Sequence, residues 1–387
     1  MSERKTIRGI LRFLSYALVA IIASCATLFW YMGSPMNNKL SELRKLIQTC
    51  YIGEVTDQQL EDGAATGMVL ATGDKWSYYI PASEYDSFME QSQNEYVGIG
   101  VTINSKMTDA GIEIIAVDKT GGAYEAGVQA GDVICQVAGQ DVVGAGTDVT
   151  KELIRGDAGS KVEIAVLRNG ETLTFEVTRK RIQIEVAKGE LLPENIGLIT
   201  IENFDERCAS ETRAQIDSLI EQGAKALVFD VRFNPGGFKK ELVEILDYLL
   251  PEGPIFRSVS YTGQETVSES DAQCLDIPMA VLVNADSYSA AEFFAAALSE
   301  YDKAVVVGEA TTGKSYYQNT FRLSDGSAVG LSIGKYCTPD GVSLADVGGL
   351  KPDVEVLLDE EALTKLYAGT LPREEDLQLQ AAIQALQ

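Results

Sequence analysis

The alternation of strand-like and helix-like segments between residues 183 and 356 constrains the fold of this chain most. Short runs of buried residue types recur there, separated by longer stretches with helical spacing. The sequence predicts strands at 196–201, 226–231, 279–283 and 304–307, and helices at 210–222, 239–250 and 291–298. This order is typical of an α/β domain. With 387 residues, 45% of them hydrophobic, the chain is long enough for two or three domains with real cores.

Residues 96–182 have a different pattern, with short alternating strands and glycine turns. Asn169-Gly170 between residues 162–168 and 171–178 predicts a β-hairpin. These segments resemble a PDZ domain, and an ordinary small β-rich domain is the alternative. PDZ domains bind a peptide C-terminus by strand addition, and backbone amides of a glycine loop hold its carboxylate. The resemblance assigns that loop to Gly98, Ile99 and Gly100.

Residues 37–95 are predicted to be helical and to pack by their apolar spacing. Thr56 and Gln59 form the pattern of a capping box, which predicts the start of a second helix that runs through Leu70.

The N-terminal segment predicts a membrane anchor. Residues 13–33 contain no charged side chain, and about 20 apolar residues suffice for a transmembrane helix. Four bases precede the run, so the positive-inside rule places residues 1–12 in the cytoplasm and the remaining body outside. A cleaved signal peptide and a lipoprotein with a lipidated Cys25 are the alternatives, and both would also export the body.

The charge excludes nucleic acid as an expected partner. The formal net charge is −25, and the chain beyond residue 36 holds 28 bases and 56 acids. Phosphate binding needs a basic surface. The six cysteines are widely spaced without a Cys-x-x-Cys pair, so we expect no metal site and no cofactor, and one unassigned disulfide is compatible with the body.

The chain has no histidine, so a Ser-His-Asp triad, a Cys-His dyad and a His-ligated zinc site are all excluded. A catalytic serine would therefore need another base, for which a desolvated lysine is suited. Ser289 follows the strand predicted at 279–283 and precedes a helix, where free amides can bind an oxyanion. A simple N-cap role for Asp286, Ser287 and Ser289 fits this segment equally well.

Two further glycine turns carry candidate chemistry. Lys314 lies in Gly308-x-x-x-x-Gly313-Lys314-Ser315, which formally matches a phosphate loop. A phosphate loop must open a helix, whereas residues 316–323 predict a strand, so nucleotide binding is disfavoured. The second turn, Asn234-Pro235-Gly236-Gly237, allows close backbone approach to a ligand, and its amides could complete an oxyanion hole.

From about residue 40 to the end, these motifs resemble the C-terminal processing peptidases, also called tail-specific proteases. The resemblance implies Ser289 as nucleophile, Lys314 as general base and Gln318 as the residue that positions the lysine. It places the oxyanion donors near Gly237 and Ala290, with Gly236 as an alternative. Some motif positions depart from the family, none of them catalytic: Asp286, Ala291, Thr312 and Ser315.

The predicted organisation is a tail and transmembrane helix at 1–36, a helical segment at 37–95, a PDZ domain at 96–182, and an α/β protease core with a C-terminal helix at 183–387. The resemblance implies a membrane-anchored serine endopeptidase that acts outside the cytoplasm by a Ser-Lys acyl-enzyme mechanism. Its PDZ domain would recognise the C-terminal tail of protein or peptide substrates, and the family leaves room for a homodimer. The alternative is a catalytically inactive, PDZ-bearing membrane scaffold.

Overall fold

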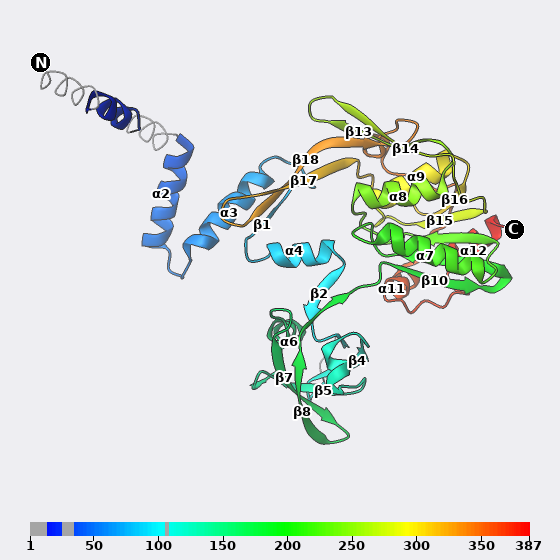
Figure 1. Cartoon of the computed structure of the whole chain (residues 1–387), viewed down its shortest axis with the longest axis horizontal. Coiled ribbons are helices and arrows are strands. Elements are labelled where there is room, and N and C mark those ends of the chain that lie inside the picture. The colour runs from blue at the N-terminus through cyan, green and yellow to red at the C-terminus, as the bar shows by residue number, and fades with distance from the viewer. Residues whose placement is uncertain (1–13, 25–34, 105–107) are drawn as a thin grey trace, which may run out of the picture. The chain divides into compact units, whose positions relative to one another are not determined.

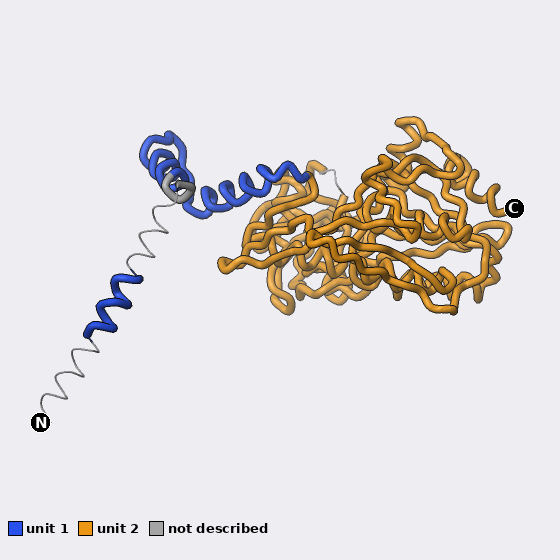
Figure 2. Tube along the Cα trace, turned by 90° about the horizontal axis from the view of Figure 1, so that it is seen from above, with its two compact units in different colours: residues 1–74 blue, residues 75–387 orange. Residues whose placement is uncertain are grey.

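The structure, a computed structural model, describes residues 14–24, 35–104 and 108–387. It divides into two compact units, residues 1–74 and 75–387 (Figure 2). The larger unit contains a parallel sheet with helices on both faces, an antiparallel sheet and a β-rich domain (Figure 1). The mixed α and β class predicted from the sequence is therefore confirmed.

The first unit is helical in its described part. Helix α2 spans Pro35–Cys50 and helix α3 spans Asp57–Leu70. The predicted capping box is present, because the Gln59 amide donates to Thr56 Oγ1 and the Thr56 amide donates to Gln59 Oε1, at 3.2 and 2.9 Å. Arg44 on α2 pairs with Asp57 and Glu61 on α3, at 2.8 and 3.1 Å.

The predicted membrane anchor is described only in part. Residues 14–24 are helical, whereas Phe13 and residues 25–33 lie outside the described residues, as does Cys25. Among the helices that the structure describes, none is both long and apolar enough to cross a membrane.

The core sheet of the second unit has the strand order β10-β11-β12-β15-β16-β19. Strands β11 to β19 run parallel, and β10 pairs antiparallel with β11 at the edge. The strands are β10 (Ala187–Leu192), β11 (Ile196–Ile201), β12 (Ala226–Asp230), β15 (Met279–Val283), β16 (Ala304–Gly308) and β19 (Val354–Glu355). The intervening helices are α7 (Cys208–Glu221), α8 (Lys239–Leu249) and α9 (Ala290–Glu300). All seven predicted elements of this α/β domain are present.

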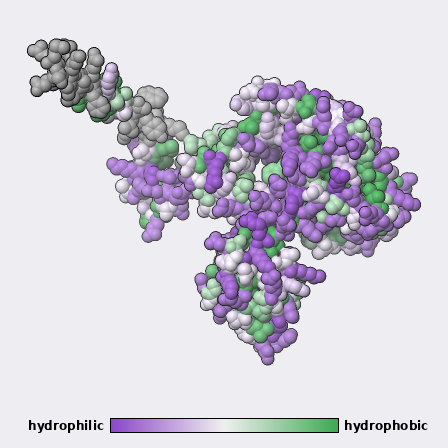
Figure 3. Space-filling model, in the orientation of Figure 1, coloured by the Kyte–Doolittle hydropathy of each residue, from purple (hydrophilic) through white to green (hydrophobic). Residues whose placement is uncertain are grey.

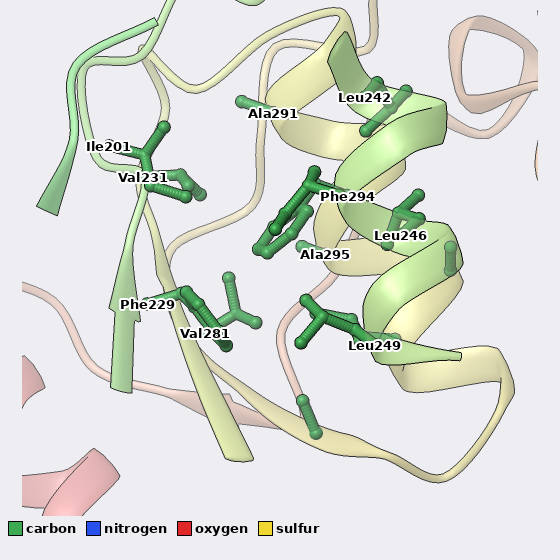
Figure 4. Packing of buried hydrophobic residues seen from close by; sticks show 14 of the residues in the cluster. Ile201, Phe229, Val231, Leu242, Leu246, Leu249, Val281, Ala291, Phe294 and Ala295 are labelled. Carbon is green, nitrogen blue, oxygen red and sulfur yellow. The ribbon is translucent and has the colours of Figure 1, made fainter. Parts of the chain in front are cut away.

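Both faces of this sheet are buried, as the continuous apolar strands require. On one face, Phe229 and Val281 pack against Leu246 of α8 and Phe294 of α9 (Figure 4). On the other, Val228 and its neighbours pack against Leu379 of helix α12 (Leu377–Ala385). Successive strand residues point to opposite faces, so each strand contributes to both cores.

The second sheet is antiparallel, with the order β1-β18-β13-β14 and β17 paired to β18. Its strands are β1 (Tyr78–Ile80), β13 (Gly253–Ser260), β14 (Glu265–Ser270), β17 (Tyr316–Arg322) and β18 (Ala328–Cys337). The prediction that residues 37–95 are helical is wrong at β1, although α4 (Tyr85–Ser92) is helical. The Tyr-Tyr-Ile run favours a strand, and β18 offers it a partner. Helices α10 (Leu344–Val347) and α11 (Glu360–Tyr367) and the 3-10 turn η1 (Pro193–Asn195) complete the core.

The β-rich domain has a sheet of order β3-β4-β5-β7-β8, with β6 paired to β5. Its elements are β3 (Val101–Ile103), β4 (Ile112–Val117), α5 (Gly122–Ala126), β5 (Val133–Val137), β6 (Gln140–Asp141), α6 (Thr147–Ile154), β7 (Lys161–Arg168) and β8 (Glu171–Thr178). The predicted hairpin is present as β7 and β8 around Asn169-Gly170. The chain enters this domain through β2 (Glu95–Gly98) and leaves it through β9 (Lys180–Gln183), and these two strands pair antiparallel. Hydrophilic residues cover most of the face seen in Figure 3, in keeping with the high charge.

Candidate active site

Three turns that carry the candidate residues follow neighbouring parallel strands. The chain leaves β12 into residues 231–237, β15 into residues 284–289, and β16 into residues 309–315. The carboxyl ends of these strands lie at one edge of the sheet. Ligands in α/β sheets bind outside this edge. The sheet therefore brings together segments that are far apart in the sequence.

Ser289 occupies a strained turn immediately before α9. Its φ of 58° and ψ of −124° are rare for a residue with a side chain, and it is 8% exposed. The preceding residues fix this turn, because Ser287 Oγ donates to Val231 O at 2.7 Å and the Tyr288 amide donates to Asn234 O at 3.1 Å. The N-cap position of Ser289 is confirmed, and the strained conformation distinguishes it from an ordinary N-cap, which has extended backbone.

The glycine turn packs directly against Ser289. A Cβ atom on Gly236 would lie 2.7 Å from Ser289 Cβ and 2.8 Å from the Ala290 nitrogen, so only glycine fits. The Gly236 amide donates to Asn234 Oδ1 at 2.8 Å. Asn234 is fully buried, and its Nδ2 donates to Ile201 O at 2.7 Å. The Ala290 amide belongs to the first turn of α9, where amides have no partner within the helix.

Lys314 lies against two aromatic rings. Its Nζ is 4.6 Å from the centre of the Trp76 ring and 5.6 Å from that of Tyr288. The two rings are themselves 5.8 Å apart. Such ring faces attract an ammonium group. Burial, followed by the charge of Asp286, raises the pKa of Tyr288. Trp76 was not among the predicted site residues, because the sequence gives no sign that the segment before β1 reaches this turn.

The serine and lysine turns are joined by further hydrogen bonds. Thr312 Oγ1 donates to Ala285 O at 2.7 Å, and the Thr312 amide donates to Ser287 O at 3.2 Å. The carboxylate of Glu292 also accepts from both turns. Sequence reasoning missed this residue, although Ser289 and Glu292 have the Ser-x-x-Glu spacing of a capping box.

Gln318 lies on β17, four positions beyond Lys314. Its Nε2 donates to Tyr316 O at 3.1 Å and to Ser332 Oγ at 2.9 Å. These bonds engage both amide hydrogens and fix the side chain, and its carbonyl oxygen Oε1 is the atom that can accept from a lysine. The chain after Lys314 continues into strand β17, whereas a phosphate loop opens a helix. This difference disfavours nucleotide binding at the lysine turn.

The predicted peptide-binding loop lies between β2 and β3. Gly98, Ile99 and Gly100 are all buried, and Ile99 belongs to the core of the β-rich domain. The Ala123 amide donates to Ile99 O at 2.8 Å, which ties the loop to α5. Gly100 has a φ of 77°, and a Cβ atom there would lie 2.7 Å from Gly121 Cα. The loop is therefore held in one conformation at the start of β3.

The described residues contain no group of three His, Cys, Asp or Glu side chains that could hold a metal ion. Five cysteines lie in the described part of the chain and are unpaired: Cys50, Cys135, Cys208, Cys274 and Cys337.

Comparison with known proteins agrees with this organisation. A family model described as peptidase family S41 matches residues 195–356, and one described as a PDZ domain matches residues 96–178. A solved structure of a putative S41 protease from Bacteroides fragilis NCTC 9343 shares the fold, with a TM-score of 0.52 and 17% identity over 86% of this chain and 92% of that one.

Two curated relatives are similar over most of this chain. The carboxy-terminal processing protease CtpA of Bacillus subtilis (strain 168) is 32% identical over 365 residues, which cover 90% of this chain and 78% of that protein. A probable CtpA-like serine protease of Staphylococcus haemolyticus (strain JCSC1435) is 30% identical over 82% of this chain and 64% of its own length. With its α/β core, its PDZ domain and the serine turn at the sheet edge, the chain thus belongs to the carboxy-terminal processing proteases of peptidase family S41, which are serine-type peptidases.

Proposed function

We propose that this protein is a membrane-anchored serine endopeptidase that cleaves protein substrates outside the cytoplasm with a Ser289–Lys314 dyad. The observation that carries the proposal is the meeting of the serine, glycine and lysine turns at one edge of the core sheet. A serine in a strained turn beside free helix amides, with a lysine on the adjacent turn, is the arrangement that acyl transfer needs.

In the proposed mechanism, Ser289 Oγ attacks the scissile carbonyl while neutral Lys314 takes its proton. The tetrahedral oxyanion accepts hydrogen bonds from the amides of Gly237 and Ala290. Gly236 is the weaker candidate, because its amide already donates to Asn234. Lys314 then gives the proton to the leaving amine, and the acyl-enzyme forms. Lys314 next activates water, whose attack releases the product and restores Ser289. Gln318 Oε1 orients the lysine.

The dyad is tested by digestion of an unfolded protein, followed by mass spectrometry, with wild type, Ser289→Ala and Lys314→Ala. Lys335→Ala is the matched control, because Lys335 also faces an aromatic ring, with its Nζ 5.3 Å from the Tyr316 ring centre. We expect cleavage by wild type and Lys335→Ala only. Near-normal cleavage by Lys314→Ala would overturn the dyad.

We also propose that the PDZ domain binds the C-terminal tail of the substrate and gates its access to the site. Strand β3 follows the glycine-containing loop at residues 98–100 and lies at the edge of its sheet, where a peptide strand can add, which supports this role. The test compares cleavage of one substrate with a free and an amidated C-terminus. The amidated form should be cleaved more slowly, through a higher KM, and equal cleavage would contradict tail recognition.

The proposed anchor rests on the uncharged run at residues 13–33 and on the four bases before it. Apolar side chains of the described helix at 14–24 are exposed, among them Leu14, Leu18 and Ile22, and an apolar medium would cover them. To test this, the full chain and a variant lacking residues 1–36 are expressed, and the membranes of each are washed at alkaline pH and separated from the soluble fraction. The full chain should stay with the membrane and be digested by protease added from outside. Release of the full chain at alkaline pH would contradict a transmembrane anchor.

A further inference from the structure

Glu292 is a fully buried carboxylate surrounded by hydrogen-bond donors. It lies in the first turn of α9 and is 0% exposed. Its Oε2 accepts the Ser289 amide at 2.9 Å and the Lys314 amide at 2.8 Å. Its Oε1 accepts the Gly313 amide at 2.7 Å and the Thr311 hydroxyl. Burying an ionisable group is costly, and full hydrogen bonding is what makes it tolerable.

These donors come from both halves of the proposed dyad. One is the backbone of the strained serine itself, and the other three belong to the turn that presents the lysine. A further hydrogen bond stabilises the lysine turn, because the Leu350 amide donates to Thr311 Oγ1 at 2.8 Å. The carboxylate is thus a common anchor that fixes the Ser289 and Lys314 backbones relative to each other.

We propose that Glu292 is a positioning residue for the Ser289–Lys314 dyad, holding the two backbones in register for proton transfer. This inference rests on the proposed function. Glu292 contacts neither the scissile bond nor the proton that passes from Ser289 to Lys314. It therefore acts through the serine and lysine turns. Misplacing reacting groups by about 1 Å can reduce a rate about 100-fold.

The chemistry of the site makes Glu292→Gln a sharp test. A glutamine in either orientation sets its NH2 group against backbone amides: two at the position of Oε2, and one at the position of Oε1, where the Thr311 hydroxyl can turn to accept. Glu300 is the matched control. It ends the same helix, about 12 Å away at 1.5 Å per residue, and burial raises the pKa of both carboxyl groups. It accepts the Asp340 amide at 2.8 Å and is hydrogen-bonded to the Thr338 hydroxyl, which can donate or accept, so a glutamine can keep both bonds.

The experiment measures peptide cleavage and the rate of labelling by a fluorophosphonate probe for the full-length variants. We expect Glu292→Gln to lower kcat and the labelling rate about 100-fold, with KM and the affinity for a free tail peptide within threefold of wild type. Glu300→Gln should stay within twofold. The acid limb of kcat/KM against pH should also move to lower pH in Glu292→Gln, because a buried negative charge near the base is lost. A variant that merely contains less folded enzyme would leave that limb in place.

A second pair of variants covers the case in which Glu292→Gln does not fold. Thr311→Val keeps the shape but removes the hydroxyl, which donates to Glu292 and accepts the Leu350 amide, whereas Thr311→Ser keeps both bonds. We expect kcat to fall about tenfold or more in the first, because a hydrogen bond to a charged group is lost, and to stay within twofold in the second.

The outcomes separate the inference from the proposed function. If wild type is labelled and Lys314→Ala is inactive, but Glu292→Gln behaves like Glu300→Gln, the positioning role is wrong and the dyad stands. If wild type is not labelled at all, or Lys314→Ala keeps its activity, the proposed function itself fails.

Discussion

Gly237→Ala is the substitution with the most sharply defined consequence for the oxyanion site. Gly237 has a φ of 151°, and a Cβ atom there would lie 2.3 Å from Phe204 C, 2.5 Å from Phe204 O and 2.6 Å from Asp205 N. All three are backbone atoms, and 3.4–4 Å is ordinary contact. The glycine turn must therefore shift by about 1 Å, which takes the Gly237 amide away from the developing oxyanion.

The magnitude follows from the loss of one oxyanion donor, which costs about 100- to 1,000-fold in kcat, or roughly 3–4 kcal/mol of transition-state stabilisation. Gly223→Ala is the control. Gly223 has a φ of 101°, and a Cβ atom there would meet no other atom within 4 Å, so this substitution carries the conformational cost alone. That cost is about 1–2 kcal/mol of stability.

The assay determines kcat and KM on a fluorogenic peptide, with thermal unfolding measured alongside. We expect kcat to collapse in Gly237→Ala while Gly223→Ala stays within twofold of wild type. A kcat for Gly237→Ala within threefold of wild type would refute the assignment of the oxyanion site to this turn.

Two further predictions concern stability. Burial, with the charges of Glu206 and Glu241, raises the pKa of Asp205 from 3.8 to about 7, so folding favours its protonated form and stability declines as pH rises from about 4 to about 7. Asp205→Asn should remove this decline. In urea unfolding followed by tryptophan fluorescence, the variant should gain about 2–4 kcal/mol of stability relative to wild type between pH 4 and pH 8, and a pH-independent difference would contradict this prediction. Asp376 caps α12 and pairs with buried Arg232 at 2.8 Å, and Arg232 also pairs with Asp230. Because Arg232 keeps that second partner, Asp376→Ala should cost about 2–3 kcal/mol, whereas Asp359→Ala, which removes an exposed N-cap alone, should cost about 1 kcal/mol; equal losses would contradict a role for the buried pair.

Sequence reasoning succeeded where one local pattern decides the structure. The strands Ile196–Ile201 and Met279–Val283 were predicted to the residue, because buried parallel strands are near-continuous runs of apolar residues. The Thr56 capping box and the Asn169-Gly170 hairpin are local in the same way.

The features that escaped prediction depend on partners distant in the chain. Strand β1 exists because β18, about 250 residues later, pairs with it. Trp76 reaches Lys314, and Glu292 accepts from residues beyond the next strand, through the packing of the whole core. A sequence pattern can mark the serine and the lysine, but not the side chains that hold them in place.

The most direct test of the Ser-Lys dyad is intact-protein mass spectrometry after reaction with a fluorophosphonate, using wild type, Ser289→Ala, Lys314→Ala and Lys335→Ala. We expect one adduct in wild type and Lys335→Ala, located on the peptide that contains Ser289, and none in the other two. An adduct on another residue, or one formed equally fast in Lys314→Ala, would contradict the Ser289–Lys314 dyad.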